Sequence, residues 1–235
     1  RGVDYVVHAA ALKQVISSEY NPTECIKTNI YGAENLIYAC LESNVKYLIA
    51  LSTDKAVNPI NLYGATKLAS DKLFIAANNY SHSYGTTFSV VRYGNVMGSR
   101  GSVIPLWQNL AKAGKPLPIT DLRMTRFWIS LEQAVEFVVD SLKLMQGGEL
   151  YVPRIPSMKL IDLANAVAPG AALEEIGMRP GEKLHEEMIT TSDSFNTIDI
   201  GKYYAILPQA NAAVQKHYED QGGKMVAPGF CYNSG

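Results

Sequence analysis

Apolar runs of strand length alternate with stretches of helical periodicity over the first 95 residues of the chain. The runs at residues 3–7, 46–51 and 86–94 have the length and composition of buried strands. Between them, residues 23–43 and 62–80 space their apolar positions as helices do. Strands that alternate with helices predict a parallel α/β sheet.

Beyond Asn95 this regular pattern loosens into loops and short helices, with one further helix expected over residues 131–145. We therefore predict two parts. Residues 1–95 form the sheet with the chemistry-bearing strand ends, and residues 96–235 form mainly a smaller subdomain, of which some segments return to the sheet. Open α/β sheets bind ligands outside the carboxyl ends of their strands, so we expect the subdomain to cap those ends.

Composition narrows the class of protein. The 235 residues are 47% hydrophobic and 18% charged, with a net charge of −1 and no basic stripe, which argues against nucleic acid as a partner and favours small ligands. Three dispersed cysteines and four dispersed histidines offer no metal-ligand spacing and suggest a reducing cytoplasm. No apolar run approaches the roughly 18–20 residues of a membrane span, so we expect a soluble, cytoplasmic protein without a metal.

Tyr63 and Lys67 lie four positions apart on the helix expected over residues 62–80, so both side chains project from one face. A free tyrosine has a pKa near 10, and a neighbouring ammonium group lowers it by about one to three units, which makes the phenolate a usable base. The same spacing is common in helices without any catalytic role. Tyr63 is nevertheless the one tyrosine of the fourteen that has a lysine at this spacing.

The position of residues 52–55 in the expected sheet is stronger evidence for a site than the Tyr-x-x-x-Lys spacing. The polar residues Ser52, Thr53, Asp54 and Lys55 directly follow a buried strand, where exposed polar side chains meet the ligand crevice of an α/β sheet. The alternative interpretation of the Asp-Lys pair is a surface ion pair at a strand end.

Four segments resemble the extended branch of the short-chain dehydrogenase/reductase superfamily, which acts on nucleotide sugars. They are the strand ending in Ser-Thr that is followed by Tyr-x-x-x-Lys, VVHAAALKQV at residues 6–15, VVRYGNVMGSRGSVIP at residues 90–105 and RPGEKLHEE at residues 179–187. The resemblance implies a Rossmann-like, doubly wound parallel sheet with a smaller α+β subdomain for the substrate.

Within that family, the narrower resemblance is to the inverting 4,6-dehydratases that act on UDP-N-acetylglucosamine in pseudaminic acid biosynthesis. It rests on STDKAVNPINLYGATK at residues 52–67 and ITDLRMTRFWIS at residues 119–130. Related retaining dehydratases carry Thr-Asp-Glu where this chain has Thr-Asp-Lys, which makes Lys55 the discriminating residue. The large membrane-anchored relatives usually have methionine in place of Tyr63, so the short soluble form fits best.

The resemblance implies a mechanism. Tyr63, assisted by Lys67, would take the proton of the sugar 4-hydroxyl while hydride passes to NADP, with Thr53 hydrogen-bonded to the carbonyl oxygen that develops. Lys55 would then remove the carbon 5 proton, and a protonated Asp54 would deliver a proton to the departing 6-hydroxyl. A neutral lysine base needs a pKa below about 10.4, which we expect burial and the Lys67 charge to supply.

The resemblance also implies which residues contact the cofactor: Ala9, Lys13, Tyr63, Lys67 and Val96. Lys13 could reach either the ribose of NADP or the substrate. His8, on the first strand, is interpreted as a packed strand residue rather than a catalyst.

Four residues are assigned to the UDP-sugar on the same grounds. Asn95 matches an asparagine that contacts the sugar, and Arg123, Arg179 and Glu182 lie in loops that hold the diphosphate and ribose. Arginine suits phosphate because its planar fork pairs with two oxygens. Each of these charged residues could equally be a solvated surface charge.

The chain departs from the family pattern at its start. The family begins with a strand and a Gly-x-x-Gly-x-x-Gly turn that cradles the cofactor diphosphate, whereas this chain opens with Arg1 and contains no such turn. We therefore expect a fragment of a longer enzyme, in which the missing first strand would lie beside residues 3–7. Alone it should expose an apolar sheet edge and be poorly soluble and inactive.

Two other functions remain open. A nucleotide-sugar 4-epimerase or a retaining dehydratase would share the tyrosine and lysine but lack the Asp-Lys pair. A non-catalytic binding or oligomerisation module is the alternative from another class, since the phosphate-binding turn is absent. Family resemblance suggests a homo-oligomer.

Overall fold

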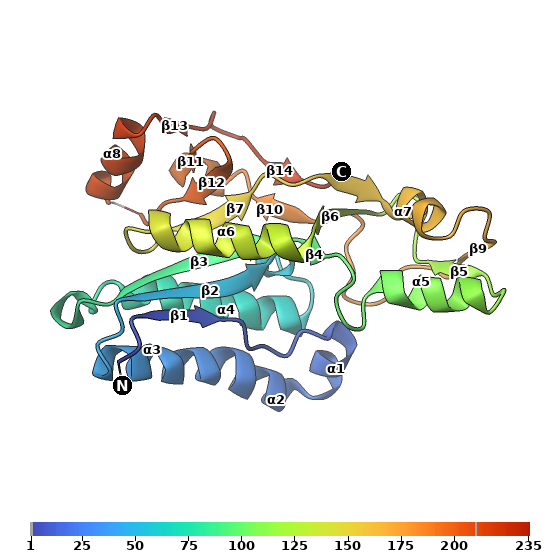
Figure 1. The fold of residues 1–235 in the computed structure, drawn as a ribbon, viewed down its shortest axis with the longest axis horizontal. Coiled ribbons are helices and arrows are strands. Elements are labelled where there is room, and N and C mark those ends of the chain that lie inside the picture. Colours follow the sequence, from blue (N-terminus) through green and yellow to red (C-terminus); the bar gives the residue numbers. More distant parts are fainter. Residues whose placement is uncertain (1, 210) are drawn as a thin grey trace.

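The computed structural model describes residues 2–209 and 211–235, and its centre is a seven-stranded sheet (Figure 1). In spatial order the strands are β1 (Tyr5–His8), β2 (Tyr47–Thr53), β3 (Thr87–Tyr93), β7 (Leu150–Pro153), β12 (Tyr203–Ile206), β11 (Thr197–Asp199) and β13 (Lys224–Met225). The first four run parallel, and the last three are antiparallel to their neighbours. The predicted Rossmann-like parallel sheet is confirmed.

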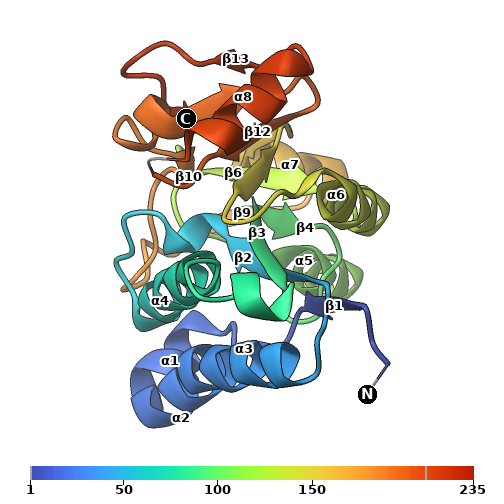
Figure 2. The ribbon, with the colours of Figure 1, turned by 90° about the vertical axis from the view of Figure 1, so that its left-hand side faces the viewer.

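Helices cover both faces of this sheet because its central strands are apolar on both faces (Figures 1 and 2). In β2, Leu48 and Ala50 pack into one core with α3 (Gly32–Glu42) and α4 (Leu62–Ala77). Ile49, between them, points to the opposite face and packs with α6 and α8. The bounds of these last two helices are Leu131–Leu144 and Ala212–Asp220.

The helix expected over residues 23–43 is divided into three parts: α2 (Pro22–Ile26), a π-helical turn (Lys27–Tyr31) and α3. The buried Asn29 lies in this turn. Its amide donates to the Leu12 carbonyl (3.0 Å) and to Thr66 Oγ1 (3.0 Å), and its Oδ1 accepts from Leu12 N (2.9 Å). The turn thus ties the loop after β1 to α4. A short helix, α1 (Val15–Tyr20), completes this region.

A smaller group of elements lies beyond the carboxyl ends of β1 and β2, at the right of Figure 1. It contains α5 (Val103–Lys112), α7 (Leu160–Val167), β5 (Leu117–Ile119) and β9 (Leu173–Glu175). A three-stranded sheet of β4 (Asn95–Val96), β6 (Thr125–Ile129) and β8 (Ser157–Lys159) connects it to the main sheet. Buried Trp107 and Trp128 anchor its own core.

The remaining elements are short. They are the strand pair β10 (Glu187–Ile189) and β14 (Tyr232–Asn233), and the 3-10 turns Asp54–Ala56, His82–Tyr84 and Asp193–Asn196. In the parts of the chain that the structure describes, no helix combines the length and the apolar character needed to cross a membrane.

Strand β1 forms one edge of the main sheet and pairs only with β2 among the described residues. Its flanking and outward side chains are apolar but exposed: Val3, Tyr5 and Val7 keep about half or more of their surface in solvent. The neighbouring strand expected from the family pattern is therefore not supplied by the described residues.

Candidate active site

Three polar residues meet where β2 ends. Thr53 caps the following 3-10 turn, since its Oγ1 accepts from the Lys55 backbone N–H (3.3 Å), and it donates the same hydroxyl to Asp54 Oδ1 (2.9 Å). Lys55 Nζ donates to that oxygen as well (3.0 Å). Asp54 is fully buried and the Lys55 side chain is only 24% exposed. A surface ion pair, the alternative interpretation of these residues, is therefore wrong.

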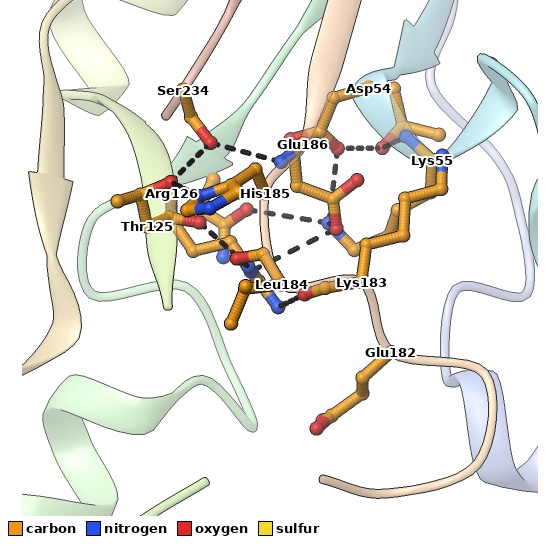
Figure 3. Close-up of polar contacts among 12 residues, drawn as sticks. Asp54, Lys55, Thr125, Arg126, Glu182, Lys183, Leu184, His185, Glu186 and Ser234 are labelled. Carbon is orange, nitrogen blue, oxygen red and sulfur yellow. Dashed lines mark hydrogen bonds and ion pairs between the residues drawn. The ribbon is translucent and has the colours of Figure 1, made fainter. Parts of the chain in front are cut away.

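A second carboxylate approaches the Lys55 ammonium from a distant part of the chain (Figure 3). Glu186 Oε1 lies 3.8 Å from Lys55 Nζ and 3.8 Å from Arg126 Nε, and its side chain is only 3% exposed. On another side, Asn95 Oδ1 accepts from Lys55 Nζ at 3.4 Å. Lys55 is thus surrounded by oxygen atoms on the ligand side of the sheet.

These carboxylates reverse the direction expected for the Lys55 pKa. Burial lowers the pKa of Lys55, but the charges of Asp54 and Glu186 outweigh burial, so the pKa lies above its ordinary value. The prediction that burial and Lys67 would lower it is wrong, because an ammonium between two buried carboxylates is stabilised in its charged form. In this state Lys55 carries a proton.

The start of α4 is pressed against the same turn. Asn61 caps the helix by accepting from Gly64 N at 2.7 Å. A Cβ atom on Gly64 would lie 2.1 Å from the Lys55 carbonyl oxygen, so only glycine allows this approach. The close contact brings Tyr63 and Lys67, both buried on α4, up to the Asp54–Lys55 turn.

The pKa values of Tyr63 and Lys67 are not set by each other, although their spacing predicts that they would be. Burial raises the pKa of Tyr63 above its ordinary value, although the Lys55 charge opposes the effect. Burial lowers the pKa of Lys67, while Asp71 acts in the opposite direction. The main cation acting on Tyr63 is therefore Lys55 and not Lys67 as expected.

Lys67 is the residue whose surroundings best fit a bound cofactor. It is 3% exposed, yet no described residue forms a hydrogen bond or ion pair with its ammonium group. A buried ammonium normally has a polar partner, and the ribose hydroxyls of a nicotinamide cofactor would provide one.

The other residues assigned to the cofactor are more scattered. Ala9 and Lys13 are exposed in the segment after β1, and Val96 is half-buried in β4. His8 packs its ring 5.4 Å from that of Phe74. Burial, and then the Lys67 charge, lower the pKa of His8 to about 4, so the imidazole is neutral at physiological pH.

Among the residues assigned to the substrate, only Asn95 joins the Lys55 cluster. The Arg123 side chain is 74% exposed and forms a two-pronged ion pair with Asp121 (3.0 and 2.8 Å). Arg179 and Glu182 pair loosely with each other (4.0 Å) on an exposed loop.

That loop is attached at two points to the segment that joins the Asp54–Ala56 turn to α4. The Asn61 amide donates to the Gly181 carbonyl (2.8 Å), and Lys183 Nζ donates to the Val57 carbonyl. Segments more than 100 residues apart in the sequence thus form one wall of the site.

Sequence reasoning missed two buried residues of this site, Arg126 and Glu186. Both were present in the strings that carried the family resemblance, at residues 119–130 and 179–187. A signal was therefore available, because a charged residue inside an apolar strand such as TRFWI is buried with a partner more often than alone.

A cleft of about 940 Å³ lies elsewhere, between α4 and a set of residues that includes Thr190, Asp193 and Leu207. Asp71 and Arg92 line it, but Lys55 and Tyr63 do not. Chemistry rather than cavity size therefore identifies the candidate active site.

The parallel sheet, the polar cluster at the end of β2 and the Tyr-x-x-x-Lys helix define a class of Rossmann-like enzymes that act on nucleotide sugars. The chain belongs to the family described as polysaccharide biosynthesis protein, whose model matches residues 1–208. It is 57% identical, over its full length, to the UDP-N-acetylglucosamine 4,6-dehydratase (inverting) of Campylobacter jejuni subsp. jejuni serotype O:23/36, of which it covers 72%. The predicted resemblance is confirmed.

Two further comparisons place the chain in the same group. The X-ray structure of Pen from Bacillus thuringiensis is 38% identical and superimposes with a TM-score of 0.92, over 100% of this chain and 72% of that one. The UDP-glucose 4-epimerase of Rickettsia akari is 42% identical over 97% of this chain and 68% of its own length.

Proposed function

We propose that this protein is an inverting UDP-N-acetylglucosamine 4,6-dehydratase. The buried contact between Asp54 and Lys55, 3.0 Å long and next to Tyr63, carries the proposal. An epimerase needs only a base at the 4-hydroxyl, whereas a dehydratase also needs a base for carbon 5 and an acid for the 6-hydroxyl. The similarity to the Campylobacter dehydratase supports the same substrate.

The order of steps follows from carbon acidity. Neither the carbon 5 hydrogen nor the 6-hydroxyl of a hexose is activated, but a ketone at carbon 4 makes the carbon 5 proton acidic. A bound nicotinamide cofactor would supply the redox chemistry, accepting hydride from carbon 4 and returning it to carbon 6. Among the described residues, Lys67 provides a buried ammonium for it, and we propose NADP as the cofactor.

Tyr63 takes the proton of the 4-hydroxyl in the first step. The nearby Lys55 charge favours its phenolate against the effect of burial. Thr53, at the end of β2, would hydrogen-bond the carbonyl oxygen that develops at carbon 4. Because it donates its hydroxyl to Asp54 in this structure, it must rotate to donate to a substrate oxygen.

Elimination then needs a neutral Lys55 and a protonated Asp54, which together hold one proton. The charges of Asp54 and Glu186 raise the Lys55 pKa and so favour this proton on Lys55, and a single transfer along the 3.0 Å contact converts one form into the other. Lys55 accepts the carbon 5 proton, and Asp54 releases its proton to the 6-hydroxyl, which leaves as water. The pair returns to its charged form, and a proton added to the opposite face of carbon 5 gives the inverted sugar.

Asn95, Arg123, Arg179 and Glu182 complete the proposal as contacts of the UDP-sugar. The contact of Asn95 with Lys55, and the attachment of the Arg179 loop to Asn61 at the start of α4, support these roles. For Arg123, binding a diphosphate means exchanging Asp121 for phosphate oxygens. The resemblance further favours a cytoplasmic homo-oligomer that serves pseudaminic acid synthesis.

The similarity to UDP-glucose 4-epimerases makes epimerisation the second candidate. Proton NMR of the product separates the two. A dehydratase creates a methyl group at carbon 6 and a ketone at carbon 4, whereas an epimerase leaves the 6-hydroxyl in place and inverts carbon 4. A product that keeps its 6-hydroxyl would overturn the proposal.

A further inference from the structure

The backbone of Glu186 is hydrogen-bonded on both sides to Ser234. Its backbone N–H donates to Ser234 Oγ (2.9 Å), and its carbonyl accepts from Ser234 N (2.8 Å). The same serine hydroxyl lies 2.7 Å from Thr125 Oγ1, on β6. The carboxylate therefore projects from a fixed point toward Lys55 (Figure 3).

Arg126 fixes the other side of the carboxylate. It is 7% exposed and donates to the carbonyl oxygens of Thr125 (2.6 Å), Lys183 (2.9 Å) and Leu184 (3.2 Å), with its Nε 3.8 Å from Glu186. These hydrogen bonds hold the Arg126 guanidinium next to Glu186. The second carboxylate oxygen of Glu186 has no hydrogen-bond partner among the described residues, and the same is true of Asp54 Oδ2.

We propose that Glu186 is a positioning residue for the dehydration, which holds Lys55 Nζ beside Asp54 and keeps the catalytic proton on the Asp54–Lys55 pair. The inference rests on the proposed function. It adds a residue that lies 131 positions from Lys55 and acts on Lys55 rather than on the substrate. Its effect passes entirely through Lys55.

The physical reason is the balance of charges around one proton. Elimination requires that the Asp54–Lys55 pair hold a single proton, and the negative charge of Glu186 makes that proton harder to lose. Arg126 opposes Glu186 at Lys55, because its positive charge lowers the Lys55 pKa. Lys183 and Arg126 also act on Glu186, whose own pKa is raised mainly by burial. Without Glu186, only the Asp54 carboxylate would oppose the effect of the Arg126 charge, and the Asp54–Lys55 pair would lose its proton at a lower pH.

The test is the variant Glu186→Gln, which removes the negative charge and keeps nearly the same side-chain shape. In single turnovers of the enzyme with its cofactor, elimination is followed as the decay of reduced nicotinamide at a series of pH values. The upper limb of the profile, where the pair loses its proton, should move down by about one unit, since a charge within about 4–6 Å changes a pKa by that order. The first hydride transfer should keep its rate.

Glu187→Gln is the matched control. This neighbouring glutamate is less buried and accepts from the Asn58 amide (2.9 Å), and among the described residues it forms no ion pair with Lys55. Its replacement should leave the profile unmoved. A purely structural role for Glu186 would lower the rate of both steps and shift neither limb, and that result would overturn the proposal.

Two further measurements keep the proposal testable. NMR titration of the lysine side chains, with Lys55 assigned through Lys55→Arg, reads its pKa directly and needs no turnover. A lower Lys55 pKa in Glu186→Gln supports the coupling even if the wild-type enzyme proves not to be a dehydratase, and an unchanged pKa refutes it. If Glu186→Gln does not fold, Glu186→Asp keeps the charge with a shorter reach. It should slow elimination alone, and wild-type elimination would count against the positioning role.

Discussion

Replacing Lys55 by arginine or by methionine separates its chemistry from its charge. Lys55 Nζ lies 3.0 Å from Asp54 and 3.8 Å from Glu186. At an effective dielectric constant of about 20, each contact is worth roughly 4–6 kcal/mol before desolvation. Desolvation offsets much of this, and removing one partner of a buried ion pair costs about 3–5 kcal/mol. Lys55→Met should therefore lower the free energy of unfolding by about 3 kcal/mol.

Lys55→Arg should behave differently, because arginine keeps a cation between the two carboxylates but has no accessible neutral form. We expect its free energy of unfolding to remain within about 1 kcal/mol of the wild type, as neither charge is left unpaired. Elimination should nevertheless fall by about 10²–10⁴-fold, the usual contribution of a general base. The first hydride transfer should proceed, since it uses Tyr63.

The assay is a single turnover with UDP-N-acetylglucosamine, followed by the absorbance of reduced nicotinamide and by urea unfolding of the same samples. Reduced cofactor should accumulate in Lys55→Arg and decay in the wild type. If Lys55→Arg eliminated water within tenfold of the wild-type rate, Lys55 would not be the base, and the mechanism built on it would be wrong.

Three other changes test separate parts of the account. Tyr63→Phe should block the first step, so that no reduced cofactor appears, and its appearance at the wild-type rate would remove Tyr63 from that role. Arg92→Met leaves the buried Asp71 carboxylate without its ion-pair partner (3.8 Å) and should lower the free energy of unfolding in urea by about 3–5 kcal/mol. Arg123→Met, at an exposed ion pair, should lower it by only about 0–1 kcal/mol. Equal losses for the two variants would contradict the burial argument. Burial and the Lys67 charge lower the pKa of folded His8 to about 4, below its ordinary value of 6.5, so the unfolded chain binds more protons between these values. Stability should fall as pH drops through that window, by up to about 3 kcal/mol, and His8→Gln should flatten this part of the unfolding curve; an unchanged slope would contradict it.

The parts of the fold that the sequence predicts are those set by local pattern. The runs that became β2 and β3 are buried at almost every position, and largely apolar, because both faces of these strands are covered. The π-helical turn at Lys27–Tyr31 was missed, since one extra residue in a turn hardly disturbs the apolar spacing of the surrounding helix.

In the site, too, the residues set by local sequence could be predicted, and those set by distant parts of the chain could not. Asp54 and Lys55 could be predicted because they directly follow a strand, and topology alone places such residues at the ligand edge. Glu186 and Arg126 could not be placed there, because they reach Lys55 only through the pairing of β10 with β14 and the position of β6. The direction predicted for the Lys55 pKa was wrong because the charges of Asp54 and of Glu186, which lies 131 positions away, together outweigh burial.

Product formation in deuterated water tests the central claim most directly. If the protein is an inverting dehydratase, UDP-N-acetylglucosamine should yield a 4-keto-6-deoxy sugar with solvent deuterium at carbon 5 and inverted configuration there, both visible by NMR at early times. Inversion is expected because the proton returns to the face opposite the one from which Lys55 removed it. A 4-keto-6-deoxy product that retains the original configuration at carbon 5, or a 4-epimer without deuterium, would contradict the account.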